Sequence, residues 1–161
     1  MCPIRVYWHV MRNYDGYWRV KLTVTNYKFG TNYSDWNVLV QHPGFKMSPS
    51  TYSFNSTLLP SLGFEGDKVA LFWGIGHYNS ELPQAKLNQE GYVTTEILLG
   101  KDVKSFTLRN GWAFPQKVSF NGENCVMPLP DDFPILPSSS FIWKPNTYHL
   151  LLLLTVVFGS S

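Results

Sequence analysis

Apolar and polar side chains alternate strictly at the start of the chain. Apolar residues occupy every second position from 4 to 10, and the same alternation returns from 18 to 25. A period of two is typical of a β-strand that buries one face. The segment between the two runs, residues 13–16, ends in Asp15-Gly16, and this pair readily adopts the positive φ angles of a tight turn. We therefore predict an antiparallel β-hairpin at the start of the fold.

Short apolar runs separated by turn residues continue to about residue 125. The further strands that we predict lie at 36–41, 51–55, 69–73, 92–99, 106–108 and 116–120. Glycine, proline and Asn-Gly pairs separate these runs. Residues 80–88 are the one segment where we expect a helical turn, and Pro83 weakens it. The pattern predicts an all-β fold, an antiparallel β-sandwich of the immunoglobulin-like kind.

The composition favours a β-rich domain and argues against binding to nucleic acid. Aromatic residues make up 16% of the chain and charged residues 15%, whereas about 25% of residues are charged in a typical globular chain. The net charge is only +2, and the basic residues are scattered. Such a chain lacks the electrostatic footprint of a nucleic-acid-binding protein. Its length allows one domain with a self-sufficient core, so we expect no cofactor.

Two cysteines, Cys2 and Cys125, lie at opposite ends of the predicted domain. A bond between them would close a loop of more than a hundred residues and stabilise the fold by roughly 4 kcal/mol. The alternative is two separate thiols, or partners in a segment outside this sequence. Sequence does not determine which sulfur atoms meet, so both outcomes stay open.

The titratable residues form no recognisable catalytic or metal-binding pattern. No spacing typical of metal ligands relates the histidines to one another or to the cysteines: His9, His42, His77 and His149. Glu65 and Asp67 flank Gly66, and a carboxylate pair can hydrolyse a glycan by acid–base catalysis. Carboxylates beside a turn glycine are more often simply solvated. We therefore expect no metal site and no enzymatic activity.

The aromatic residues divide into two groups by their surroundings. Trp8, Trp18, Trp36 and Trp73 occupy apolar-periodic positions or apolar runs, where packing in the core is the usual role. Tyrosines close to predicted turns are expected to be exposed, and their flat rings suit stacking on sugars: Tyr14, Tyr17, Tyr27 and Tyr33. Asn32 and Asn55 each begin an Asn-X-Ser/Thr sequon and are candidate N-glycosylation sites if the protein enters the secretory pathway.

The composition changes abruptly after residue 127. Four prolines fall within residues 128–137, which we interpret as an extended stalk because proline cannot pair in a central β-ladder. The hydrophobic segment 148–159 follows, and its twelve residues are too short for an ordinary membrane-spanning helix. Small residues, a spacer and a hydrophobic tail are typical of a signal for attachment of a GPI lipid.

This pattern divides the chain into a β-sandwich domain at 2–127, a stalk at 128–137 and a GPI-attachment signal at 138–161. Ser138 is the predicted attachment residue and Ser139 the alternative. In the competing interpretation the tail is kept and packs into the fold as an extra strand.

Several segments, read together and in order, resemble the COBRA and COBRA-like family of plants. They are CPIRVYWHV at 2–10, YWRVK at 17–21, NYSDWN at 32–37, VQHP at 40–43, GWAFP at 111–115 and FNGENCVMP at 120–128. The resemblance implies a GPI-anchored, non-enzymatic protein on the outer face of the plasma membrane. It also implies a part in organising cellulose microfibrils, in cell-wall biogenesis and in oriented cell growth.

The match covers only the second half of such a protein. A signal peptide, a cellulose-binding-like region and a Cys-Cys-Val-Ser motif precede it in the family, and we therefore expect a truncated member. The expected partners are cell-wall polysaccharide, contacted directly or indirectly, and the membrane through the lipid. The alternative function is an unanchored glycan- or cellulose-binding module whose tail packs into the fold.

Overall fold

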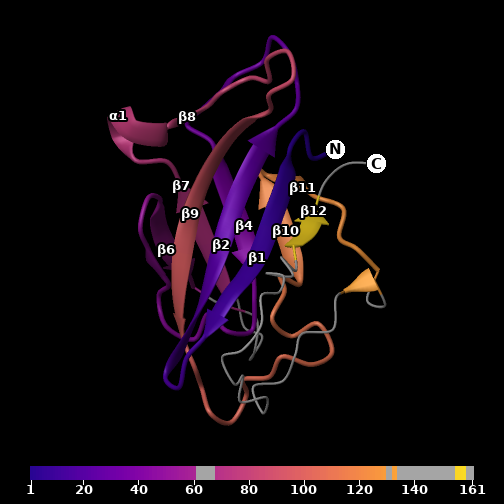
Figure 1. Cartoon of the computed structure of the whole chain (residues 1–161). Helices are drawn as coiled ribbons and strands as arrows, with labels where there is room; N and C mark the ends of the chain where they lie inside the picture. The colour runs from indigo at the N-terminus through magenta and orange to yellow at the C-terminus, as the bar shows by residue number, and fades with distance from the viewer. Residues whose placement is uncertain (61–67, 130–131, 134–154, 159–161) are drawn as a thin grey trace, which may run out of the picture.

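The computed structural model describes residues 1–60, 68–129 and 132–133, together with the backbone of 155–158. Within these residues the chain forms two antiparallel sheets, one in front of the other in Figure 1. The front sheet has the strand order β12-β1-β2-β9-β5. Its strands are β1 (Arg5–Asn13), β2 (Tyr17–Asn26), β5 (Ser50–Thr51), β9 (Gly91–Gly100) and β12 (Thr155–Phe158).

The rear sheet has the strand order β11-β10-β4-β7-β6. Its strands are β4 (Asn37–Gln41), β6 (Asn55–Leu59), β7 (Val69–Trp73), β10 (Lys117–Phe120) and β11 (Glu123–Asn124). A small pair, β3 (Tyr33–Ser34) and β8 (Glu81–Leu82), lies near the short helix α1 (Gly76–Asn79) at one end of the sandwich (Figure 1). The predicted all-β, antiparallel sandwich is confirmed.

The alternation at the start of the chain produces the predicted hairpin. β1 and β2 pair antiparallel from Arg5 opposite Thr25 to Asn13 opposite Trp18, with one irregularity between Val10 and Arg12. Because successive side chains point to opposite faces, alternate residues of both strands enter the core. β9 then pairs with β2 along ten residues, which makes β2 a central strand of the front sheet.

The core lies between the two sheets and is rich in aromatic rings. Trp8, Trp18 and Trp36 are fully buried there, as the sequence predicts. The rear sheet contributes its own inward-facing residues, including Val38, Val40, Phe72, Val118 and Phe120. Trp73 is only half-buried, because Ala70 and Phe72 are the β7 residues that face the core.

The structure corrects three predicted elements. Residues 106–108 form no strand: the chain turns at Asp102, whose carbonyl accepts the Phe106 N–H at 2.8 Å, and the Phe106 ring packs against Trp18. The predicted strand 51–55 is split, because the chain leaves the front sheet after β5 and joins the rear sheet as β6. The helical turn expected at 80–88 is absent, since α1 ends at Asn79 and residues 81–82 pair with β3 instead.

A disulfide joins the two sheets. Cys2 precedes β1 of the front sheet and Cys125 follows β11 of the rear sheet, and their Cα atoms lie 4.7 Å apart. Both residues are buried. The sequence left open whether the two cysteines are bonded, and in the structure they form a disulfide.

Candidate functional site

The segments that resemble the COBRA family meet inside the sandwich. Trp8 of the first segment donates its indole N–H to the carbonyl oxygen of Ala113, at 2.9 Å. His42 stacks on Trp8 with 5.5 Å between ring centroids and meets Trp112 edge-on at 5.3 Å. Residues that are far apart in the sequence thus build one packed unit. Their role in the fold is structural, because Trp8 and His42 are fully buried and Trp112 is half-buried against them.

His42 is the buried titratable residue of this unit. Its side chain is fully enclosed, and its Nδ1 accepts the backbone N–H of Gly44 at 2.8 Å. Burial lowers the pKa of His42 to about 4, while the nearby Ala113 carbonyl opposes this shift. The imidazole is therefore neutral at neutral pH, with its proton on Nε2, since Nδ1 is an acceptor. His42 is therefore a residue of the packed core.

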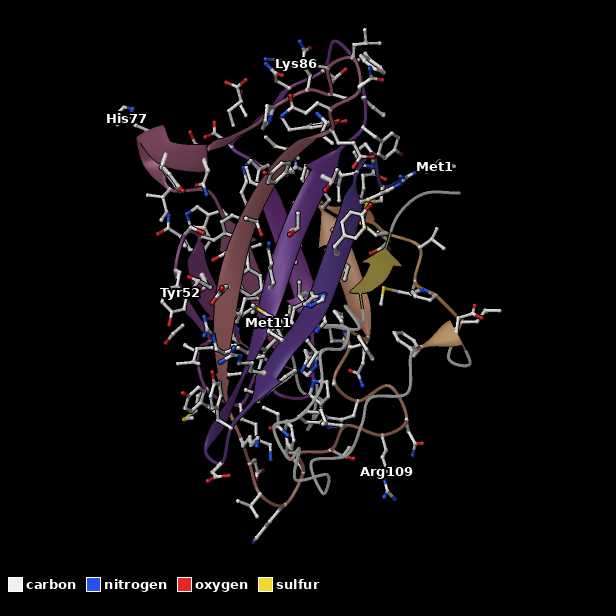
Figure 2. All side chains as sticks on the ribbon, viewed as in Figure 1. Met1, Met11, Tyr52, His77, Lys86 and Arg109 are labelled. Carbon is white, nitrogen blue, oxygen red and sulfur yellow. A yellow bond between two sulfur atoms is a disulfide. The ribbon has the colours of Figure 1, made fainter. Side chains whose placement is uncertain are left out.

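A groove of about 490 Å³ lies on the outer face of the front sheet, over β1, β2 and β9. We call it the Tyr7–Tyr92 groove; its lining residues are Tyr7, His9, Met11, Lys21, Thr23, Thr25, Glu90, Tyr92 and Thr94. In Figures 1 and 2 this face is turned toward the viewer, and Met11 is labelled on it. The groove exists because these residues are the outward half of the alternation whose inward half forms the core.

Threonine hydroxyls form the middle of the groove. Thr23 and Thr94 lie opposite each other on β2 and β9, with their Oγ1 atoms 2.8 Å apart. Thr94 also donates to the carbonyl oxygen of Leu22 at 3.1 Å. Because a hydroxyl has a single proton, Thr23 must be the donor to Thr94. Lone pairs of the Thr23 oxygen are thereby left to accept a hydrogen bond.

Charges of both signs surround these hydroxyls. Arg5 and Glu90 form an ion pair at 3.7 Å, and Arg19 pairs with Glu96 in the adjoining part of the sheet. The pKa of His9 is lowered, first by partial burial and then by the positive charge of Lys21. The neutral form of His9, which both donates and accepts, is thus favoured near neutral pH.

The tyrosines singled out in the sequence do not gather on one surface. Tyr14 and Tyr17 stack on each other at the β1–β2 turn, with centroids 4.5 Å apart. The Arg5 guanidinium lies over Tyr27, 5.1 Å from its ring centre. Tyr33 is half-buried and meets Phe120 edge-on at 5.2 Å. Of these four tyrosines Tyr17 is exposed, whereas Tyr14, Tyr27 and Tyr33 are half-buried.

Tyr7 and Tyr92 are the groove residues that the sequence reasoning missed. Each stands at a polar position of an alternating strand, next to the buried Val6 and Val93. The alternation could have identified them, because an aromatic ring at an outward position of a predicted strand lies on the outer face of the sheet. Rings near turns, in contrast, can fold back on each other.

The two sequons differ in their surroundings. Asn32 is exposed, and its side-chain oxygen accepts the Gln84 N–H at 2.7 Å. The side-chain nitrogen of Asn32, the atom that carries an N-linked glycan, takes no part in this hydrogen bond. Asn55 begins β6 and donates its side-chain nitrogen to the Gly74 carbonyl at 3.1 Å. The other candidate residues, Glu65, Asp67, Ser138, Ser139 and His149, lie outside the described residues.

Among the described residues, no group of three or more His, Cys, Asp or Glu side chains is placed to hold a metal ion. His77 lies on α1, well away from the groove (Figure 2). In that same part of the chain, no helix has the length and apolar character needed to span a membrane.

Four residues of the predicted tail lie against the sandwich. β12 pairs antiparallel with the outer edge of β1, where Trp8 is opposite Val156 and His9 is opposite Thr155 (Figure 1). Of the predicted stalk the structure describes Pro128, Leu129, Asp132 and Phe133; the rest of the stalk and the rest of the 138–161 segment lie outside the described residues. The Phe133 ring packs on Phe114, with centroids 5.3 Å apart.

Comparison with known proteins agrees with the resemblance seen in the sequence. The model of the COBRA family C-terminal domain matches residues 1–134. COBRA-like protein 3 and COBRA-like protein 1 of Oryza sativa subsp. japonica are 48% and 52% identical over 99% and 87% of this chain. Protein COBRA of Arabidopsis thaliana is 48% identical over 86% of the chain. The chain spans about a third of the length of these relatives, with 35%, 31% and 30% of each covered. It therefore belongs to the COBRA family, and what it contains is the family's C-terminal domain.

Proposed function

We propose that the chain is a non-enzymatic, wall-facing module of the plant cell surface that takes part in organising cellulose during oriented cell growth. The observation that carries this proposal is the family match over residues 1–134, together with relatives of 48–52% identity over most of the chain. The use of the family segments in core packing supports a structural role: Trp8, His42 and Ala113 contact one another and not an open site.

The proposal includes attachment to the membrane through a GPI lipid, with Ser138 as the attachment residue and Ser139 as the alternative. It rests on the three consecutive serines at 138–140, the following spacer and the leucine-rich run at 150–154. Small side chains are needed at the cleavage site, and the hydrophobic tail is removed when the lipid is attached.

Enzymatic release tests the anchor. The full chain, tagged and expressed in plant cells behind a secretory leader, is expected to move from the membrane fraction to the soluble fraction after treatment with a phosphatidylinositol-specific phospholipase. A variant in which Ser138, Ser139 and Ser140 are all replaced by Leu should not be released, because bulky side chains block cleavage. Release of both proteins, or of neither, contradicts GPI attachment at these serines.

A second candidate has an observation of its own in its favour. Pairing of β12 with β1 is what a retained tail would do, and the protein would then be an unanchored glycan-binding module. Intact-mass measurement of the mature protein separates the two functions, since removal of everything after Ser138 leaves a lighter polypeptide that carries the lipid. A mature protein that retains Leu150–Phe158 favours the unanchored module.

A further inference from the structure

We propose that the Tyr7–Tyr92 groove binds an extended segment of a neutral polysaccharide, with the two tyrosine rings against the sugar faces and the threonine hydroxyls between them. The proposal rests on the proposed function and deepens it, because it assigns contact with the wall to one surface of this domain.

The two rings are placed for a ligand that runs diagonally across the strands. Tyr92 is 55% exposed, and Tyr7 is half-buried on the same face of the sheet. Tyr7 lies opposite Thr23 on β2, and Tyr92 lies opposite Thr25 on the same strand. The rings therefore belong to strands two steps apart, about 10 Å across the sheet, and they are offset by two residues, about 7 Å, along it. That spacing suits an elongated ligand better than a compact one.

The middle of the groove offers hydrogen bonds between the two rings. The Thr23 oxygen has free lone pairs, since its proton is donated to Thr94 and the Thr94 proton to Leu22. Lys21 adds donors at one end, and Glu90 adds acceptors at the other. A sugar presents apolar C–H faces and a rim of hydroxyls that both donate and accept, which matches rings flanked by this mixture of groups.

The charges around the groove favour a ligand without net charge. Of the charged residues in this part of the sheet, Arg5 is paired with Glu90 and Arg19 with Glu96. A phosphate or another anion would meet the carboxylate of Glu90, and a cationic ligand would meet Lys21. The volume of about 490 Å³ falls within the usual range of small-ligand sites, roughly 300–1,000 Å³. All the lining residues lie on β1, β2 and β9 or beside them, so removal of the tail leaves the groove in place.

Titration of the purified full chain with cellohexaose, a soluble linear β-glucan, tests the proposal by calorimetry and by NMR. The unmodified protein is expected to bind it. Tyr92→Ala and Tyr7→Ala should each weaken binding about fivefold or more, the loss expected for one ring contact. Tyr92→Phe keeps the ring and should bind nearly as well as the unmodified protein, which also shows that position 92 tolerates substitution.

Tyr78→Ala is the matched control, because Tyr78 is 74% exposed on α1 and lies outside the groove. It should leave the affinity unchanged. The proposal is overturned if cellohexaose does not bind, if Tyr92→Ala binds normally while folded by near-UV circular dichroism, or if Tyr78→Ala weakens binding equally. If the phospholipase releases the protein but cellohexaose does not bind it, the result contradicts the groove proposal and leaves the proposed GPI anchor standing. If cellohexaose binds but the protein is never anchored, the result contradicts the GPI proposal and leaves the groove proposal standing.

Discussion

His42, in the short VQHP segment, packs against several aromatic rings at the centre of the core. Its ring lies among Trp8, Trp18, Phe45 and Trp112, with centroid distances of 5.3–5.5 Å. A neutral imidazole fits this apolar surrounding, and its Nδ1 holds the turn at Gly44 through one hydrogen bond. Protonation would put a positive charge in a site closed to water, at a large energetic cost.

Stability should therefore depend on pH through His42. Its pKa is lowered from 6.5 to about 4 in the folded protein, so the unfolded chain takes up the proton first as the pH falls. The contribution of neutral His42 is complete above about pH 6.5 and is lost as the pH falls to about 4, a change of about 3 kcal/mol. Urea unfolding followed by tryptophan fluorescence at pH 7, 5.5 and 4 measures it.

Replacement of His42 separates this effect from other titrating groups. His42→Asn keeps a side-chain acceptor for the Gly44 N–H but cannot titrate, so its unfolding free energy should vary much less over the same range. His77→Asn, at an exposed position on α1, should retain the pH dependence of the unmodified protein. Equal pH dependence in His42→Asn and the unmodified protein would show that His42 is not the group responsible.

Strand β12 covers part of the edge of β1. Edge strands expose unpaired backbone N–H and C=O groups, which invite pairing with other chains. Here residues Val6–His9 of β1 are paired with β12. The same β12 residues fall in the segment that GPI attachment would remove, so the β1 edge differs between a tail-retaining form and a lipid-anchored form.

Hydrogen exchange should report this difference. In the full chain, the β1 amides between Val6 and His9 that point away from β2 are expected to exchange slowly. In a form processed at Ser138 they should exchange quickly, because their partners are gone. Amides of β2, which is paired on both sides, are the internal control and should be slow in both forms. Equally fast exchange of the edge amides in the two forms would mean that β12 does not pair with β1 in solution.

The two sheets of the sandwich are held together by the core and by one covalent bond. The Cys2–Cys125 disulfide spans 123 residues of sequence and ties the start of the front sheet to the end of the rear one. A long loop loses much conformational entropy in the unfolded chain when it is closed. The bond is therefore expected to stabilise the whole domain and not only its two ends.

Removal of the disulfide should lower the unfolding free energy by roughly 4 kcal/mol, the value expected for a loop of this length. The double variant Cys2→Ser with Cys125→Ser, compared with the oxidised protein by urea unfolding, measures the loss. Reduction of the unmodified protein should reproduce it, and that sample controls for the changed side chains. A reduced protein as stable as the oxidised one would show that the bond adds nothing.

Most strands and the first hairpin were predictable because their signal is local. Alternation at residues 4–10 and 18–25, with Asp15-Gly16 between them, specifies a hairpin before any distant contact forms. The prediction was wrong at residues 106–108, where apolar side chains pack from an irregular loop onto Trp18 and Trp112. Apolar character alone does not separate these two outcomes, since both bury the side chain.

The surroundings of His42 and the Tyr7–Tyr92 groove were decided by the tertiary structure. His42 meets Trp8 and Trp112, and Tyr7 comes near Tyr92, only when strands far apart in sequence come together. The alternating pattern shows which face of each strand is buried, but not which strands become neighbours or which side chains then share a face. The alternation of apolar and polar residues is a property of each segment by itself, whereas a site forms only where several segments pack together.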